Sequence, residues 1–292
     1  MLEQKRITLE SKSVFETYFN NMNNSTYNFT NMFMWSGETS ITYAETFGCL
    51  VLFFQFGKNP PMASYPIGLG DKKSAILSVC EHLREQGVRP VFRNLSDWMK
   101  DELSELFPDS FEFIYDRDNS DYIYETKQMI DLSGKKLHGK KNHFNYFCNT
   151  YPHEYVRLTA SDMPACKELF ERWMNNSDDS SAENAKAATL RVMDNLENLN
   201  VTAGGILVNG TLVAASFAEP VSEDTVLVHL EFADQSFRGV YPAMSQRFCQ
   251  NEWSSYQYLN REEDMGLSGL RQAKLAYRPV YILDKYAAVW CK

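Results

Sequence analysis

The stretch GGILVNGTLVAASFAEP, residues 204–220, indicates two adjacent β-strands. The Asn209-Gly210 pair between them favours the type I′ turn of a tight β-hairpin. A third β-rich run, TVLVHLEFA (225–233), follows, and RGVYPAMSQRFCQNEW (238–253) places a glycine turn ahead of a helical pattern. This half of the chain is therefore predicted to run through antiparallel strands, a glycine turn and a helix.

The first half of the chain shows the same order. SITYAETFGCLVLFFQF (40–56) predicts a hairpin, and the Gly-Leu-Gly turn at 68–70 leads into KKSAILSVCEHLREQG (72–87), a helical pattern that ends at a glycine. Each half also begins with Arg-x-Thr and an amphipathic helical pattern, RITLESKSVFETYFN (6–20) and RLTASDMPACKELFERWM (157–174). The repeated order indicates an internal duplication.

The predicted fold class is α/β (α+β), with two tandem units that each contain a mixed, largely antiparallel sheet. We expect the units to span residues 1–150 and 151–292, because the second Arg-x-Thr entry follows shortly after residue 150. A chain of 292 residues with 44% hydrophobic content can fill two cores of ordinary size.

The bulk composition predicts a soluble, cytoplasmic protein. The longest apolar run, CLVLFFQF (49–56), is far shorter than the roughly 20 residues of a membrane-spanning helix, and the charged N-terminus lacks the apolar centre of a signal peptide. Six scattered cysteines without a C-x-x-C pair argue against a zinc site and against a disulfide framework, so no metal ligand is predicted.

One basic segment stands out in a chain whose formal net charge is −9. Such a charge disfavours non-specific binding to nucleic acid or anionic lipid, so these partners would need a local cationic patch. DLSGKKLHGKKNHFNYF (131–147) supplies one. It is either a solvated linker or a strip that contacts the phosphates of a nucleotide, tRNA or lipid headgroup. The candidate phosphate- or tRNA-contacting residues are Lys136, Lys140, Lys141 and His143.

Three segments together resemble a known family. They are DYIYETKQMIDLSGKKLHGKKNHFNYF, RGVYPAMSQRF and YLNREEDMGLSGLRQAKLAYRP (258–279). In these the chain resembles short bacterial proteins related to the C-terminal domain of phosphatidylglycerol lysyltransferase. The resemblance implies two tandem folds of the GNAT acyltransferase superfamily, a duplication that Fem-type peptidyltransferases share. It also implies transfer of an acyl group, typically an aminoacyl group from tRNA, onto a hydroxyl or an amine.

The resemblance further implies a lysine within a Leu-Arg-x-x-Lys-x-x-aromatic-x-Pro pattern. Here that pattern falls on Leu270, Arg271, Lys274, Tyr277 and Pro279. Lys274 is the first candidate catalytic residue. We expect a helix from Ser268 to about Tyr277 with Leu270, Ala273 and Tyr277 on its core face.

The acidic run before this helix, Glu262 to Asp264, has two interpretations. It either forms an ion-pair network that fixes the strand-to-helix turn, or it holds cations that bind an anionic part of the donor or acceptor. On the second reading the candidate substrate-binding residues are Asn260, Arg261, Glu262, Glu263, Asp264, Arg271 and Tyr277.

Glu231 is the second candidate catalytic residue. It lies on the strand before the glycine turn, where it is either a solvent-facing member of an alternating strand or an acceptor for the proton of the attacking amine. His229, two residues earlier, shares its face. The glycine turn adds Arg238 and Tyr241 as candidate substrate-binding residues, although Pro242 removes one N–H donor from an anion site there.

These features leave three functions open. The first is a transferase that uses aminoacyl-tRNA as donor and a small molecule, peptide or lipid headgroup as acceptor. The second is a non-catalytic protein that kept the tandem fold and binds an amino acid or aminoacyl ligand. The third is an N-acetyltransferase with acyl-CoA as donor, which the incomplete glycine loop disfavours. No cofactor is predicted with certainty.

Overall fold

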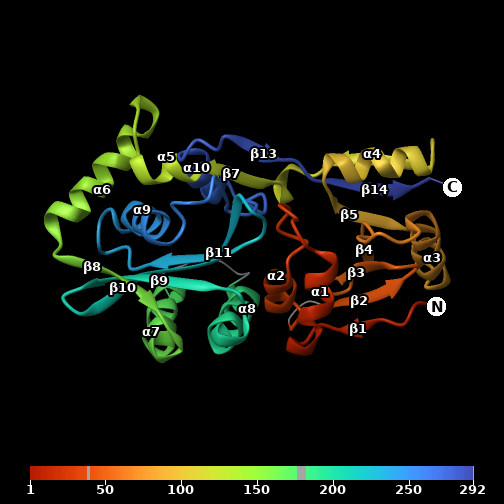
Figure 1. The fold of residues 1–292 in the computed structure, drawn as a ribbon, viewed down its shortest axis with the longest axis horizontal. Coiled ribbons are helices and arrows are strands. Elements are labelled where there is room, and N and C mark those ends of the chain that lie inside the picture. Colours follow the sequence, from red (N-terminus) through yellow and green to blue (C-terminus); the bar gives the residue numbers. More distant parts are fainter. Residues whose placement is uncertain (38–39, 176–181, 292) are drawn as a thin grey trace. The chain divides into compact units, whose positions relative to one another are not determined.

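The computed structural model describes residues 1–37, 40–175 and 182–291. These residues form two compact units, Met1–Asp121 with Leu283–Lys292, and Tyr122–Ile282. Each unit contains a seven-stranded mixed sheet, which can be followed in Figure 1. In both sheets one pair of neighbouring strands is parallel, β4 with β5 and β11 with β12.

The first sheet has the strand order β1-β2-β3-β4-β5-β14-β6. Its strands are β1 (Lys5–Arg6), β2 (Ser40–Thr46), β3 (Cys49–Gln55), β4 (Met62–Ser64), β5 (Val91–Leu95), β6 (Phe111–Tyr115) and β14 (Tyr286–Trp290). The helices of this unit are α1 (Lys12–Tyr18), α2 (Phe29–Trp35), α3 (Lys72–Glu85) and α4 (Asp97–Leu106). The last strand of the chain thus lies between β5 and β6 and pairs antiparallel with both.

The second sheet has the order β13-β7-β12-β11-β10-β9-β8. Its strands are β7 (Asp121–Glu125), β8 (His153–Leu158), β9 (Thr202–Val208), β10 (Thr211–Pro220), β11 (Thr225–Ala233), β12 (Tyr258–Asn260) and β13 (Tyr281–Leu283). The helices are α5 (Thr126–Asp131), α6 (His138–Thr150), α7 (Met163–Asn175), α8 (Ala182–Asp194), α9 (Val240–Glu252) and α10 (Ser268–Leu275). Helix α9 covers one face of this sheet, and α7 and α8 cover the other (Figure 1).

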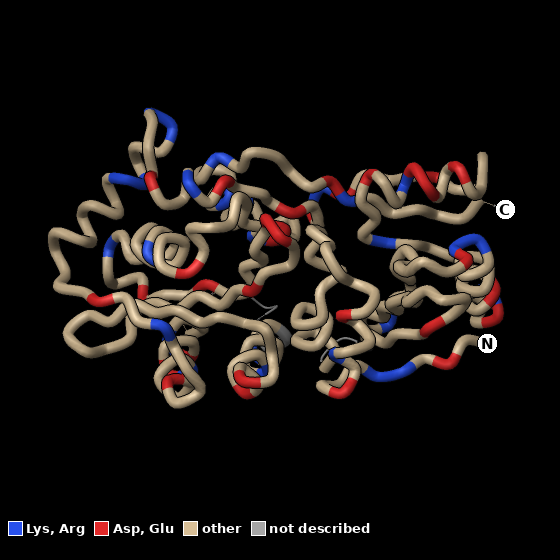
Figure 2. The backbone as a smooth tube through the Cα atoms, viewed as in Figure 1, with Lys and Arg blue, Asp and Glu red and all other residues tan. Residues whose placement is uncertain are grey.

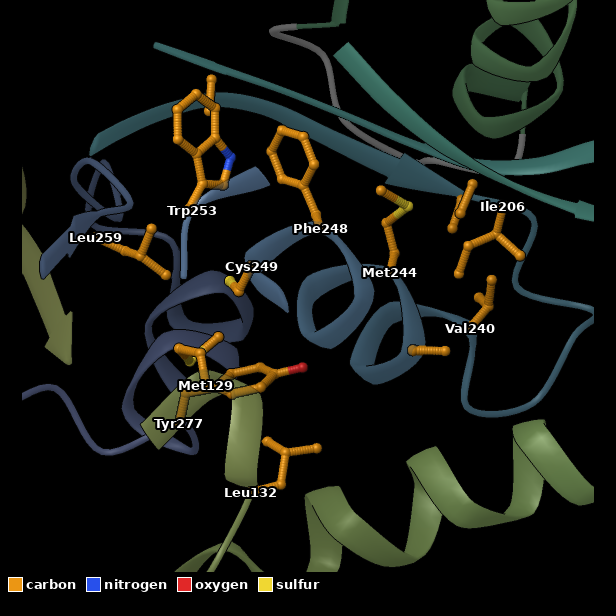
Figure 3. Packing of buried hydrophobic residues seen from close by; sticks show 14 of the residues in the cluster. Met129, Leu132, Ile206, Val240, Met244, Phe248, Cys249, Trp253, Leu259 and Tyr277 are labelled. Atoms are coloured by element: carbon orange, nitrogen blue, oxygen red, sulfur yellow. The ribbon is translucent and has the colours of Figure 1, made fainter. Parts of the chain in front are cut away.

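Helix α9 is the centre of the second core because most of its residues from Val240 to Cys249 are buried. Val240, Met244 and Phe248 recur every four residues, so they line one face and point at the sheet (Figure 3). Cys249 is buried on a neighbouring face, where Met129 and Tyr277 also lie. A helix buried on more than one side fixes the loops at both of its ends, and the first of these loops follows β11.

The predicted fold class is confirmed, since two mixed, largely antiparallel sheets stand in tandem. The division of the chain, however, does not coincide with the predicted boundary at residue 150. Residues 122–150 belong with the second unit, because Tyr122, Tyr124, Met129 and Phe147 are buried in its core. Strands β7 and β14 join their sheets by pairing with strands that are distant in the sequence. Local periodicity in the sequence does not predict such pairings.

Within the described residues, the helices are all too short or too polar to cross a membrane.

Candidate functional site

The charged segment between β12 and α10 forms an ion-pair and hydrogen-bond network. Arg271 donates from Nε and Nη2 to the two carboxylate oxygens of Asp264, both at 2.8 Å, and the Tyr122 hydroxyl and the Gly266 N–H also donate to Asp264. Asp264 is fully buried. Burial alone would raise its pKa, but these hydrogen bonds and the charge of Arg271 hold the pKa at about 2. Asp264 is therefore a structural anion.

Lys274 lies in the same network. Its Nζ donates to the backbone carbonyl of Arg261 at 2.6 Å and to that of Glu263, and it lies 5.6 Å from the centre of the Tyr122 ring. These contacts fix the backbone on which Arg261 stands. They favour a positioning role for Lys274, and a direct catalytic role stays a prediction.

Helix α10 differs in part from the expectation for this segment. It ends at Leu275, Ala273 is exposed and Leu270 is only half-buried, so of the three expected core residues only Tyr277, beyond the helix end, is buried. The short helix is held by its polar network rather than by an apolar face.

His229 is completely enclosed between two carboxylates. Its Nε2 lies 2.9 Å from Glu219 and its Nδ1 lies 3.3 Å from Glu262. Burial acts to lower the pKa of the imidazole, but hydrogen bonds and charge from the two glutamates raise the pKa to about 9. His229 is therefore a cation at neutral pH. It joins β11 to β10 and to the loop after β12, and its hydrogen bonds go to these glutamates rather than to Glu231.

Glu231 is the centre of a second polar group, the Glu231 cluster, which consists of Glu231, Ser245, Arg261 and Tyr277. The Ser245 hydroxyl donates to both Glu231 carboxylate oxygens, at 3.0 and 2.9 Å, and Arg261 Nη2 donates to Oε1 at 2.8 Å. The Glu231 and Arg261 side chains are 11% and 15% exposed, so this ion pair is shielded but reachable. The predicted residues Glu231, Arg261 and Tyr277 thus do come together.

Tyr277 links the cluster to helix α6. The Arg261 guanidinium lies 5.2 Å from the centre of the Tyr277 ring, and Lys140 Nζ lies 4.1 Å from the same centre. Burial raises the pKa of the Tyr277 hydroxyl, which is directed towards the underside of α9 (Figure 3). Lys140 therefore approaches the Glu231 cluster across one aromatic ring.

A hollow of about 340 Å³ opens between α6 and the start of α9, and we call it the α6–α9 hollow. Lys140 lines it and connects it to the Glu231 cluster through the Tyr277 ring. The lining of this hollow includes Lys140, His143, Gln235, Phe237, Gly239 and Tyr241. Gly239 has φ +89°, and a Cβ added there would lie 2.2 Å from the His143 carbonyl oxygen. Only glycine permits α6 to pack this closely on the turn, so the sequence of the turn and the shape of the hollow are coupled.

A second hollow, of about 270 Å³, lies on the other side of the same turn, between α7 and the end of β11. Arg172, Trp173, Asn175, Asp234 and Gln235 line this α7–β11 hollow. Gln235 contributes to both hollows. Trp173 Nε1 donates to the Tyr241 hydroxyl at 2.9 Å and so fixes the side chain that lines the first hollow.

The predicted basic strip is divided by the structure. Figure 2 shows its lysines along the loop before α6 and the start of that helix. Lys140 and His143 line the α6–α9 hollow, whereas Lys136 and Lys141 are exposed and Lys141 donates to the carbonyl of Asp131 at 3.5 Å. Lys140 and Lys141 separate because adjacent residues of an α-helix point about 100° apart, and Lys136 lies outside α6, in the 3-10 turn Lys135–Leu137.

The remaining predicted residues hold the loops around the cluster. Asn260 is fully buried, and its Oδ1 accepts from the Glu262 N–H at 2.7 Å. Glu262 pairs with His229, and the Glu263 carbonyl accepts from Lys274. Arg238 is exposed, with its guanidinium 4.7 Å from the centre of the Tyr146 ring.

Sequence reasoning missed Ser245, Tyr124 and Glu219. Ser245 lies on an almost wholly buried helix and binds Glu231, and the ring of Tyr124 lies 5.9 Å from the Arg261 guanidinium. A serine in an otherwise apolar helical repeat was the one available signal for Ser245. Nothing in the local pattern indicates Tyr124 or Glu219, because their strands, β7 and β10, approach Arg261 and His229 only through the pairing of the sheet.

Two tandem units, each built on a seven-stranded mixed sheet with helices, define the fold class of this protein. Two solved structures share that fold at low identity. They are L-PGS from Bacillus licheniformis, with 16% identity, TM-score 0.68 and coverage of 98% of this chain and 93% of that one, and FemX, with 9% identity, TM-score 0.61 and coverage of 98% and 97%.

The chain belongs to the family described as phosphatidylglycerol lysyltransferase, C-terminal, which matches residues 19–289. A conserved protein of unknown function from Bacteroides thetaiotaomicron is 34% identical, with TM-score 0.92 and complete coverage of both chains. An uncharacterized protein of Mycoplasmoides gallisepticum is 27% identical over 175 residues. That match spans 58% of this chain and about half, 55%, of the curated relative.

Proposed function

We propose that the protein transfers an aminoacyl group from aminoacyl-tRNA to an amine or hydroxyl acceptor. The observation that carries the proposal is the Glu231 cluster, a shielded carboxylate–guanidinium pair that Tyr277 and Lys140 connect to an open hollow in a chain of this family. Two hollows that share Gln235 give room for a donor and an acceptor on either side of one turn. A transferase requires both to be held at once.

In this reaction the acceptor nitrogen or oxygen attacks the carbonyl carbon of the aminoacyl ester. The new bond forms, the ester bond to the terminal ribose breaks, and the proton of the acceptor passes by way of Glu231 to the departing ribose oxygen. Glu231 is assigned as the proton acceptor because Ser245 and Arg261 fix its carboxylate. Since the ester is already activated, placement of the two substrates dominates the rate.

Acyl-CoA is a less suitable donor at the β11–α9 turn. Pro242 offers no N–H to a pyrophosphate, and the His143 carbonyl oxygen packs so closely on the turn that it lies 2.2 Å from the position of a Cβ added at Gly239. A ligand-binding role without catalysis is the second candidate, and it is favoured by the engagement of Lys274 with backbone carbonyls.

The test is a transfer assay with radiolabelled aminoacyl-tRNA, extracts of candidate acceptors, and Glu231→Gln as the matched variant. We expect the wild type to move the label and Glu231→Gln to lose about two orders of magnitude in rate, the range for a general base. Glu223→Gln, at an exposed acid in the turn before β11, serves as the control. Transfer from acetyl-CoA without transfer from any aminoacyl-tRNA would contradict the proposal.

A further inference from the structure

Lys140 is a half-buried cation whose ammonium makes no ion pair with any described carboxylate. The ammonium lies over the Tyr277 ring, at 4.1 Å from Nζ to the ring centre. Burial and then the charge of Arg261 lower the pKa of Lys140, while Glu231 acts in the opposite direction. The ammonium therefore lies in surroundings that do not fully compensate its charge.

The charges around it explain this. The charge of Glu231 acts on Lys140, but Arg261 and the hydroxyl of Ser245 already compensate that charge. The cluster and Lys140 together thus carry one excess positive charge. Leaving a partly buried cation unpaired is costly unless a ligand supplies the missing anion.

The lining of the α6–α9 hollow is consistent with such a ligand. Lys140 and His143 are basic groups in its lining, and the described lining residues include no aspartate or glutamate. Phe237 and Tyr241 complete an aromatic wall. About 340 Å³ admits a small aminoacyl or peptide-terminal group.

We propose that the α6–α9 hollow binds a carboxylate-bearing group of the substrate, with Lys140 as its counter-ion. The group is either the side chain of an acidic aminoacyl unit or the free carboxylate of a peptide-like acceptor, and the hollow disfavours a lysyl group because its excess charge is positive. This inference rests on the proposed function for the meaning of donor and acceptor, but binding itself can be measured without any transfer.

The experiment is a protein-observed NMR titration with small probes, followed at the backbone signals of Gly239 and Tyr241. Glutamic acid α-amide represents an acidic aminoacyl unit and lysinamide a basic one. Glycylglycine represents an acceptor with a free carboxylate, and glycylglycinamide is its uncharged match. Inorganic phosphate is the remaining probe.

We expect one of the two carboxylate probes to bind at least tenfold more tightly than its match, roughly the effect of one charge-assisted hydrogen bond. Lys140→Gln should remove this preference and Lys140→Arg should retain most of it. Lys127→Gln, at an exposed lysine of α5, controls for the change in net charge. The probe that binds identifies the aminoacyl unit or the acceptor as the source of the carboxylate.

Three results would overturn the inference. They are the failure of both carboxylate probes to bind more tightly than their matches, a carboxylate affinity that Lys140→Gln leaves unchanged, or tighter Lys140-dependent binding of inorganic phosphate. Because no tRNA is present, a protein that binds the carboxylate probe but fails the transfer assay would contradict only the proposed function.

Discussion

Lys274 donates to two backbone carbonyls of the segment that also carries Arg261. Lys274→Met keeps the bulk of the side chain and removes the donors, which leaves two carbonyls short of a partner. We expect a loss of about 1–3 kcal/mol in the free energy of unfolding, together with slower transfer because Arg261 is less well held. Denaturant unfolding and the transfer assay measure the two effects.

Lys127→Met is the matched control for Lys274→Met, because Lys127 is 85% exposed and pairs with Asp131 on the surface. Unchanged stability combined with complete loss of transfer would assign Lys274 a direct role in the chemistry instead.

His229 makes the stability of the second unit depend on pH. Its pKa is about 9 in the folded protein, raised above the value of about 6.5 expected in the unfolded chain. The stabilising contribution is therefore fully present below about pH 6.5 and is lost as pH rises through 9, by up to about 3 kcal/mol. Urea unfolding from pH 6 to 10 checks this. His229→Gln should flatten the profile over that window, and an equally steep profile in the variant would assign it to other groups.

Single residues were predictable where their type demanded a special role. Glu231, Arg261 and Tyr277 were expected at the site, and the structure brings them together. Lys140 was expected on a phosphate-contacting strip, but its approach to Tyr277 follows from the packing of α6 and is not written in any local pattern. The acids after β12 allowed two readings, and their contacts favour the ion-pair network for Asp264 and Glu262.

At the scale of elements, the contact between α6 and the β11–α9 turn depends on Gly239. Gly239→Ala places a Cβ 2.2 Å from the His143 carbonyl, so α6 has to move away from the turn. Gly210→Ala is a closer control, because Gly210 in the β9–β10 turn has φ +79° but no atom within 4 Å of the added Cβ. The control should lose only the cost of a left-handed backbone, about 1–2 kcal/mol.

We expect Gly239→Ala to lose more stability than Gly210→Ala and also to abolish Lys140-dependent binding in the hollow. Thermal unfolding and the NMR titration measure the two effects. Equal losses in the two variants would show that backbone conformation alone requires glycine at position 239.

Elements with a strong local pattern were predicted well. The hairpin around Asn209-Gly210 and the helix after Gly239 occur as β9–β10 and α9. Helix α10 was expected to run to Tyr277 with an apolar face, but it ends at Leu275. Its apolar residues follow the spacing of an amphipathic helix, but the helix is held in place by the hydrogen bonds of Arg271 and Lys274.

For the whole molecule, the internal duplication could be predicted because the order of elements repeats along the chain. The extent of each unit was not, since β7 and β14 pair across long sequence separations. The last strand brings with it Lys285, which is 2% exposed and donates to Asp121 Oδ1 at 2.7 Å and to Ser25 Oγ at 2.8 Å. The first unit therefore contains a buried ion pair whose two partners come from distant parts of the sequence.

This arrangement predicts how fragments fold. A fragment of residues 1–150 lacks β14, which leaves β5 and β6 without their shared partner and Asp121 without its buried counter-ion. Removal of one partner of a buried ion pair alone costs about 3–5 kcal/mol. We expect this fragment to lack a cooperative unfolding transition. Residues 1–121 joined by a flexible linker to 283–292 should regain that transition.

The matched control for the linked fragment carries Lys285→Met, which keeps β14 but removes its ammonium. Circular dichroism during thermal unfolding distinguishes the three chains. We expect the linked fragment to be the most stable, the Lys285→Met version to be weaker, and the 1–150 fragment to show no sharp transition. Cooperative unfolding of residues 1–150 at the stability of the linked fragment would mean that β14 is dispensable, and the boundary expected from the sequence would then describe an autonomous unit.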